Sequence, residues 1–274
     1  MSEEIKDKKK LLVLTGIIAI AVLVVGSIIF LNGVPGIYTS GTDHEEIVLS
    51  NIEKKESAPN YIAEGNMVLS LESMGMREEI PGEFTTYETF EGEKMRTDMT
   101  MSAPQGMDQD IQNQEDIETL ETSTFILPEG TFSCIEETDE WICQEGEEAT
   151  MGTEMSPAKE EMEKLIENEA LEFKGDVEER EVAGRTCDYV EMEIDADKME
   201  DAQMQGTEGA TIEISQCYDK ETGISLIENI KFGTPGESLS IEMEVNSLEL
   251  EADMPGDIFD LPAEPEPMQQ MPMY

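Results

Sequence analysis

The chain has 274 residues, and its 64 acidic residues against 17 basic ones give a formal net charge of −47 at pH 7. Binding to nucleic acid requires a basic surface, so this charge excludes a nucleic-acid partner for the acidic part of the chain. We interpret the acidity as a carboxylate-covered surface adapted to a saline or cation-rich medium, with cation capture as the alternative.

The first predicted element is a transmembrane helix at residues 11–32. Residues 11–31 include no charged side chain, and a helix of about 20 apolar residues spans the hydrocarbon core of a bilayer. Lys6, Lys8, Lys9 and Lys10 precede this segment, and basic residues that flank a first span remain in the cytoplasm. A cleaved signal peptide is the second interpretation, although its apolar region is only about 7–15 residues long. The sequence therefore predicts a single-pass protein of the cell membrane, with a cytoplasmic N-terminal tail and an extracytoplasmic remainder.

Residues 33–42 are interpreted as a linker, and residues 43–262 as one extracytoplasmic domain. A helix is predicted from Thr42 or Asp43, either of which can cap its first turn, to about Glu56. After this helix the apolar residues alternate with polar ones, which is the period of a β-strand. The strands predicted by this criterion lie at about residues 61–72, 84–90, 95–101, 123–127, 177–182, 187–194, 212–217, 226–232 and 239–250.

Three further features complete the predicted domain. The last long strand changes parity between Val245 and Leu248, which predicts a β-bulge near Asn246. A second helix is predicted from Pro157 to Ala170, because its apolar residues recur at intervals of three and four. Residues 263–274 are rich in proline and methionine and are predicted to be a disordered tail.

The four cysteines indicate two disulfides in an oxidising compartment, although four cysteines allow three connectivities. Cys134 and Cys143 would face each other in a hairpin, at a Cα separation that suits a disulfide. Cys187 and Cys217 both fall on the acidic side of their predicted strands, as a cross-strand bridge between them requires. We therefore predict the pairs Cys134–Cys143 and Cys187–Cys217.

The sequence offers little to support catalysis, and we expect no enzymatic activity. The single histidine, His44, lies next to the linker, which argues against a serine–histidine catalytic pair. No phosphate-binding loop or zinc-protease motif occurs. Asp195, Asp197 and Asp201 resemble the start of a calcium loop, but Met199 stands where another ligand belongs, so we interpret them as a polar loop. Paired carboxylates carry no weight as evidence in so acidic a chain. We predict no metal site and no cofactor.

Methionine is unusually frequent, with 19 residues, and several of these fall on the apolar faces of predicted strands. Because methionine is flexible and polarisable, a surface lined by it can repack around varied apolar ligands. Ordinary core filling is the alternative for any single residue. The candidate ligand-binding face consists of Met67, Leu69, Met95, Met99, Met101, Met192, Ile241 and Met243.

The predicted order is an N-terminal helix, a meander of strands, one mid-chain helix and more meander. Its distinctive segments are FEGEKMRTDMT (90–100), STFILPEGTFSCIEETDEWICQ (123–144), CYDKETGISL (217–226) and DIFDLP (257–262). In these features the chain from about Glu45 to Pro262 resembles the LolA/LolB-like group of lipoprotein carriers. The resemblance implies an open half-barrel whose concave apolar side is shielded by helices and can hold acyl chains. Carriers of that group are usually soluble or lipid-anchored, whereas this chain has a predicted membrane helix and four cysteines. We therefore expect a fixed lipid sensor or membrane-tethered acceptor, and we interpret the chain as an archaeal-type, membrane-anchored relative of the group.

The predicted fold class is α+β, with an N-terminal transmembrane helix followed by one curved antiparallel sheet, a half-barrel, and two packing helices. The predicted function is non-catalytic binding of a lipid or a lipidated protein on the apolar concave face. The alternative is a structural or interaction protein of the cell surface, with a closed core and no ligand cavity. A third and weaker possibility is an extracellular hydrolase that uses paired carboxylates. The sequence leaves the oligomeric state open.

Overall fold

The computed structural model describes residues 43–73, 76–89, 94–102, 119–137, 140–146, 162–163, 165–195, 198, 211–234 and 237–267. The predicted cytoplasmic tail (1–10), membrane helix (11–32) and linker (33–42) lie outside these ranges. Among the described residues, no helix is both long enough and apolar enough to cross a membrane. The elements are α2 (Asp43–Glu56), β1 (Tyr61–Ser73), β2 (Met76–Glu88), β3 (Met95–Ser102), β4 (Thr119–Leu127), β5 (Gly130–Glu137), β6 (Glu140–Glu145), β7 (Leu171–Val182), β8 (Arg185–Asp195), β9 (Thr211–Asp219), β10 (Ser225–Thr234), β11 (Glu237–Leu250) and β12 (Glu266–Pro267).

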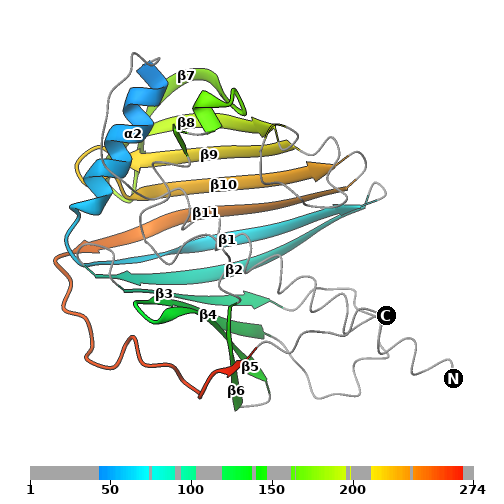
Figure 1. The fold of residues 1–274 in the computed structure, drawn as a ribbon, viewed down its shortest axis with the longest axis vertical. Helices are drawn as coiled ribbons and strands as arrows, with labels where there is room; N and C mark the ends of the chain where they lie inside the picture. Colours follow the sequence, from blue (N-terminus) through cyan, green and yellow to red (C-terminus); the bar gives the residue numbers. More distant parts are fainter. Residues whose placement is uncertain are drawn as a thin grey trace, which may run out of the picture.

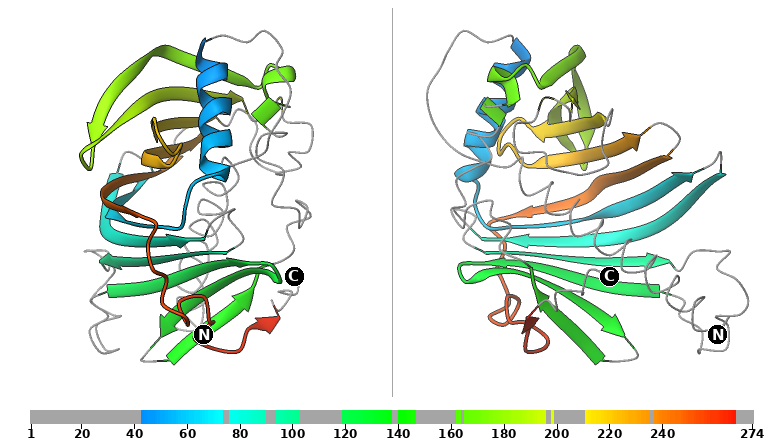
Figure 2. Two further views of the ribbon diagram at one scale, coloured as in Figure 1. Left: turned by 90° about the vertical axis from the view of Figure 1, so that its left-hand side faces the viewer. Right: turned by 45° about the vertical axis from the view of Figure 1, so that its right-hand side comes forward.

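All of these strands belong to one open sheet, with the order β12-β6-β5-β4-β3-β2-β1-β11-β10-β9-β8-β7 (Figure 1). Every neighbouring pair is antiparallel except β12 and β6, which are parallel. The predicted antiparallel sheet is therefore confirmed. Figure 2 shows that the sheet twists strongly and that α2 lies against one side of its upper half. We call this side the inner face and the opposite side the outer face.

The β-bulge predicted near Asn246 is confirmed at the centre of the sheet. Glu64 of β1 pairs with Ser247 of β11, but its neighbour Gly65 pairs with Val245, so Asn246 has no partner in the register. The extra residue restores the parity of β11, and Leu248 therefore lies on the same face as Val245. The predicted change of parity in the sequence was the signature of this bulge.

Strands β2 and β7 begin well before the residues predicted for them. The predicted strand 84–90 is part of β2, which begins at Met76 and contains Pro81. The register of β2 with β3 begins only at Gly82, so Pro81 has no paired residue on β3 that would require its missing N–H group. Strand β7 begins at Leu171 instead of residue 177, and its register shifts between Lys174 and Glu178. Pro81 interrupts the alternation of apolar and polar residues in β2, and the register shift interrupts it in β7. The first halves of these two strands were therefore not predicted.

The second predicted helix is described only in part. Residues 162–163 and 165–167 are helical, and Met162, Leu165 and Ile166 pack with α2 in one apolar cluster on the inner face. That cluster also contains Val48 and Ile52 of α2, together with side chains of β8, β9 and β10. Both helical segments therefore cover the upper half of the inner face, as amphipathic helices do on a sheet.

The outer face of β4, β5 and β6 has a separate apolar core. Phe125, Phe132, Cys134 and Cys143 are buried there, and Phe259, Leu261 and Ala263 from the segment after β11 pack against them. Arg96 on β3 donates a hydrogen bond of 2.9 Å to the Ile258 carbonyl and thereby holds this segment. Residues 263–267, which we predicted to be part of a disordered tail, are thus part of the fold, and Glu266–Pro267 pair with β6.

Both predicted disulfides are formed. Cys134 and Cys143 are directly opposed in the register of β5 and β6 and are bonded to each other. Cys187 on β8 is bonded to Cys217 on the neighbouring strand β9. All four side chains are buried, and each bridge joins adjacent strands of a different half of the sheet.

The bulge requires a glycine at position 65, and this requirement can be tested. A Cβ atom at this position would lie 2.2 Å from the Glu244 carbonyl oxygen and 2.6 Å from the Phe84 ring. Gly65→Ala should therefore lower the free energy of unfolding by about 1–3 kcal/mol through overpacking, as measured by denaturant titration. Gly256→Ala is the control, because no atom lies within 4 Å of its added Cβ, and its effect should stay within about 0.5 kcal/mol. Equal effects of the two substitutions would contradict this account.

Candidate functional site

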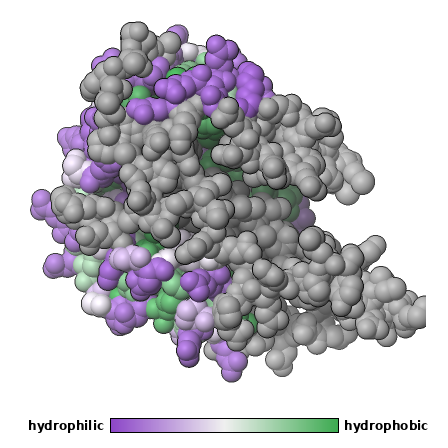
Figure 3. Space-filling model, in the orientation of Figure 1, coloured by the Kyte–Doolittle hydropathy of each residue, from purple (hydrophilic) through white to green (hydrophobic). Residues whose placement is uncertain are grey.

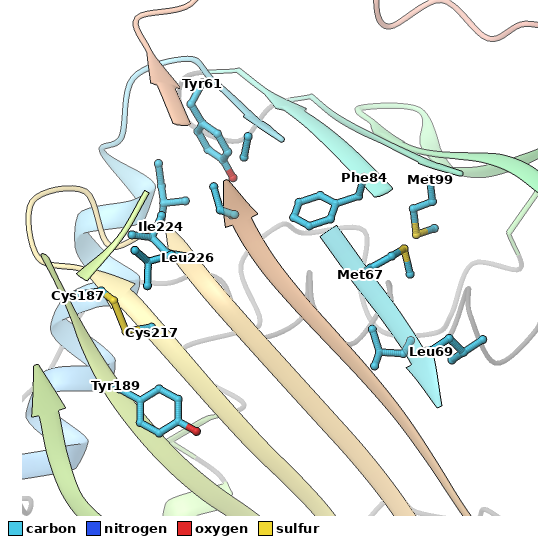
Figure 4. Close-up of a cluster of buried hydrophobic side chains, with 14 of the residues drawn as sticks. Tyr61, Met67, Leu69, Phe84, Met99, Cys187, Tyr189, Cys217, Ile224 and Leu226 are labelled. Atoms are coloured by element: carbon cyan, nitrogen blue, oxygen red, sulfur yellow. A yellow bond between two sulfur atoms is a disulfide. The ribbon is translucent and has the colours of Figure 1, made fainter. Parts of the chain in front are cut away.

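The structure brings six of the eight predicted face residues together on the inner face. Met67 pairs with Met243 across β1 and β11, and Leu69 pairs with Ile241 in the same register. Directly paired residues share a face of the sheet. The side chains join one apolar cluster with Ile80 and Phe84 of β2 (Figure 4). We call this set the methionine face: Met67, Leu69, Ile80, Phe84, Met99, Met101, Ile241 and Met243.

The other two predicted residues lie elsewhere. Met192 belongs to the cluster under α2, where it is buried with Val48 and Ile52. Met95 faces the inner side of β3 opposite Glu88 but is not a member of the apolar cluster. Sequence alternation identified the correct face of each strand, but it did not show which parts of that face the helix covers.

The methionine face is largely shielded from solvent in this structure, with Met243 half-buried and the other members buried. Met67 is 3% exposed, Leu69 is 2% exposed and Met99 is 5% exposed. In the space-filling view of Figure 3, hydrophilic residues crowd the upper edge, whereas hydrophobic residues are visible further inside this face. Binding of an apolar ligand to the methionine face therefore requires the face to open.

Helix α2 is anchored to the neighbouring part of the same face. Its side chains pack on β7, β8 and β9, and the His44 ring stacks on Phe173 with centroids 5.7 Å apart. Near the other end, the backbone of α2 approaches Gly223 so closely that an added Cβ would lie 1.9 Å from the Asn51 carbonyl oxygen. Gly223 also has a φ of +72°, so only glycine suits this turn between β9 and β10.

A buried polar cluster borders the methionine face at the C-terminal end of α2. Lys55 Nζ lies 3.1 Å from Glu88 Oε2, and both side chains are less than a tenth exposed. The Tyr61 hydroxyl donates a hydrogen bond of 2.5 Å to the same carboxylate oxygen. The lysine therefore connects the helix to the first two strands of the sheet inside a low-dielectric environment.

The second half of this cluster is built on β9 and β10. Gln216 Nε2 donates a hydrogen bond of 2.8 Å to Glu228 Oε1, and the Tyr218 hydroxyl donates to Gln216 Oε1. Glu228 is 6% exposed, and Gln216 is fully buried. We use the name polar cluster for Lys55, Tyr61, Glu88, Gln216, Tyr218 and Glu228.

Burial governs the electrostatics of the polar cluster. It raises the pKa of Glu228 to about 8, against the opposing effects of the Gln216 hydrogen bond and the Lys55 charge. Burial and the neighbouring Glu88 raise the pKa of Tyr61 well above its ordinary value, and burial raises the pKa of Tyr218 likewise. At neutral pH Glu228 is therefore largely protonated, which leaves Lys55 and Glu88 as the charged pair.

Sequence reasoning missed the polar cluster, although a signal was present. Glu228 alternates with Ile230 and Phe232, and Glu88 alternates with Phe84, so each glutamate occupies an apolar-face position of its strand. A charged residue at such a position indicates a buried polar partner. Among the residues that the structure describes, no group of three or more His, Cys, Asp or Glu side chains could hold a metal ion.

Comparison of the sequence with known protein families and with curated proteins gives no match. Solved structures that match include a DUF1329 family protein from Desulfovibrio piger, at 10% identity, with 77% of this chain and 94% of that chain covered and a TM-score of 0.35. A putative outer membrane lipoprotein-sorting protein domain from Vibrio parahaemolyticus matches at 11% identity over 79% of this chain and 96% of that chain, with a TM-score of 0.37.

The MucA/MucB complex of Pseudomonas aeruginosa matches at 13% identity and a TM-score of 0.40. The match covers 80% of this chain but only 61% of the matched chain. Identities of 10–13% and TM-scores of 0.35–0.40 indicate only a distant likeness in fold.

The buried acid Glu228 predicts a pH dependence of stability. Because its pKa is about 8 in the folded protein against an ordinary value of 4.5, its stabilising contribution is complete below pH 4.5 and is lost as the pH rises through 8. The slope reaches about 1.4 kcal/mol for each pH unit. Glu228→Gln imitates the protonated acid, so the variant should gain stability relative to the unmodified chain as the pH rises from 5 to 8. Denaturant titrations at several pH values measure this difference, and parallel curves would refute the prediction.

Proposed function

We propose that the chain is a membrane-anchored, extracytoplasmic, non-catalytic protein that binds the acyl chains of a lipid or a lipidated protein on the methionine face. One observation carries this proposal. Met67, Met99, Met101 and Met243 lie together within the four consecutive strands β3-β2-β1-β11, beside the part of the sheet on which α2 packs. Flexible thioether side chains can repack around an inserted alkyl chain at a lower cost than branched ones.

The polar cluster supplies the polar groups that a site for an amphiphile needs in addition to an apolar lining. Ligand sites combine an apolar lining with a few convergent polar groups of shifted pKa. Tyr61 and Glu88 belong to β1 and β2, the same strands that carry Met67 and Phe84. An amphiphile whose alkyl chain lies on the methionine face would thus have hydrogen-bonding groups near one end. The predicted membrane helix at 11–32 would hold this domain beside the bilayer that supplies the ligand.

A cell-surface protein with a closed core is the second candidate. The low exposure of Met67, Leu69 and Met99 favours it, because a face that never opens needs no ligand. In that case the methionines fill the core, and the acidic surface makes the contacts with other molecules.

Lipid binding by the chain purified from membranes distinguishes the two candidates. Native mass spectrometry should detect co-purified lipid on the unmodified chain. Met243→Gln places an amide on the methionine face and should reduce the bound fraction about tenfold, equivalent to about 1.4 kcal/mol, because an alkyl chain cannot pair with the amide.

Met95→Gln is the matched control, since this methionine is also half-buried on the inner face but lies outside the cluster. It should retain the lipid. A chain that stays empty when phospholipids are offered supports the closed-core candidate, and equal loss in both variants places the lipid elsewhere.

A further inference from the structure

The outer face carries a polar groove that the lipid proposal does not use. It has a volume of about 340 Å³ and extends across β2, β1, β11, β10 and β9. On β1, Ser70 and Glu72 line it, whereas their neighbours Leu69 and Leu71 face the opposite side. The residues that line the groove are Ser70, Glu72, Arg77, Glu213, Ser215, Asn229, Ile230, Lys231, Ser238, Ser240 and Glu242.

Differences in side-chain length create this groove. Its floor consists of short polar residues, with Ser70 directly opposite Ser240, and Asn229 directly opposite Ser215. Longer charged side chains such as Arg77 and Lys231 stand at its rim and are about half exposed. The floor therefore presents hydroxyl and amide groups from adjacent strands at a common depth.

One floor residue has an unmet hydrogen-bonding requirement. Ser70 is 5% exposed, and its Oγ atom is buried without a hydrogen-bond partner. An unsatisfied buried hydroxyl is destabilising and calls for an explanation. A ligand seated in the groove could supply the partner after a rotation about the serine χ1 bond.

The lining selects the chemistry of such a ligand. Ile230 is the one apolar residue of the lining, and its side chain belongs to the inner-face cluster under α2. The lining includes no aromatic ring. Lys231 is paired with Glu213 at 3.1 Å, and Arg77 with Glu79 at 2.9 Å, so neither cation is free for an anion on a chain of this negative charge. What remains is an alternation of hydrogen-bond donors and acceptors, which matches a ligand with several hydroxyl groups.

We propose that this groove binds an uncharged, polyhydroxylated ligand, namely a sugar unit of a glycan. The ligand hydroxyls exchange hydrogen bonds with Ser70, Asn229 and Ser240 on the floor and with the carboxylates at the rim. The volume is at the lower end of the range for small-molecule pockets, which suits a ligand of this size. The site is independent of lipid binding, because it lies on the other face of the sheet.

Saturation-transfer difference NMR with glucose, galactose, mannose and N-acetylglucosamine tests this proposal. The full chain is kept in lauryldimethylamine oxide, because a detergent with a sugar headgroup would compete. At least one sugar should give a saturable signal. Asn229→Ala should reduce its affinity about tenfold, whereas Thr85→Ala, a control on the outer face of β2 outside the groove, should leave the affinity unchanged.

Ser70→Ala supplies a second measurement. Removal of an unpartnered hydroxyl should raise Tm, and loss of a ligand contact should weaken sugar binding in the same variant. The proposal is overturned if none of the sugars binds, or if Asn229→Ala and Ser70→Ala bind as the unmodified chain does.

Discussion

The pairing of β1 with β11 is the interaction on which the rest of the structure depends. These strands lie at the centre of the sheet and pair along their whole length. The side-chain period of a strand is two, so one slip of register would move every apolar residue to the other face. The single unpaired residue, Asn246, absorbs the change of parity in β11 and keeps Leu248 on the same side as Val245 and Met243. Gly65 makes this irregularity possible, because the Glu244 carbonyl and the Phe84 ring occupy the space that a side chain would need.

This central pairing separates two faces of different chemistry. On β1 and β11 the inner side carries members of the methionine face, and the outer side carries serines and charged residues. A lipid or a lipidated protein on one face and a sugar on the other would suit a protein held at a cell surface, where both kinds of molecule occur. The two proposals are separable because no side chain serves both faces.

The position of α2 depends on burying charge as well as apolar surface. Val48 and Ile52 supply the hydrophobic contact, but Lys55 carries an ammonium group into a buried site where Glu88 compensates it. Removal of one partner of such a buried pair leaves the other unpaired, at a cost of about 3–5 kcal/mol. The protonated state of Glu228 avoids a further uncompensated charge in the same place. The end of the helix that adjoins the methionine face is thus held by polar contacts rather than by packing alone.

The sequence by itself determined the features that depend on local period and spacing. Alternation identified the apolar face of β1, β3, β8 and β11, the parity change located the bulge, and the opposed positions of Cys134 and Cys143 in a hairpin fixed one disulfide. The start of β2 could not be predicted, because Pro81 interrupts the alternating pattern. Pro81 is tolerated in this strand because it has no paired residue on β3. Only the tertiary structure decided that the segment around Phe259 covers the outer core, and that Lys55, Glu88 and Glu228 converge. These residues come from distant parts of the chain, and their contacts depend on the strand order and on the docking of α2, which no local pattern encodes.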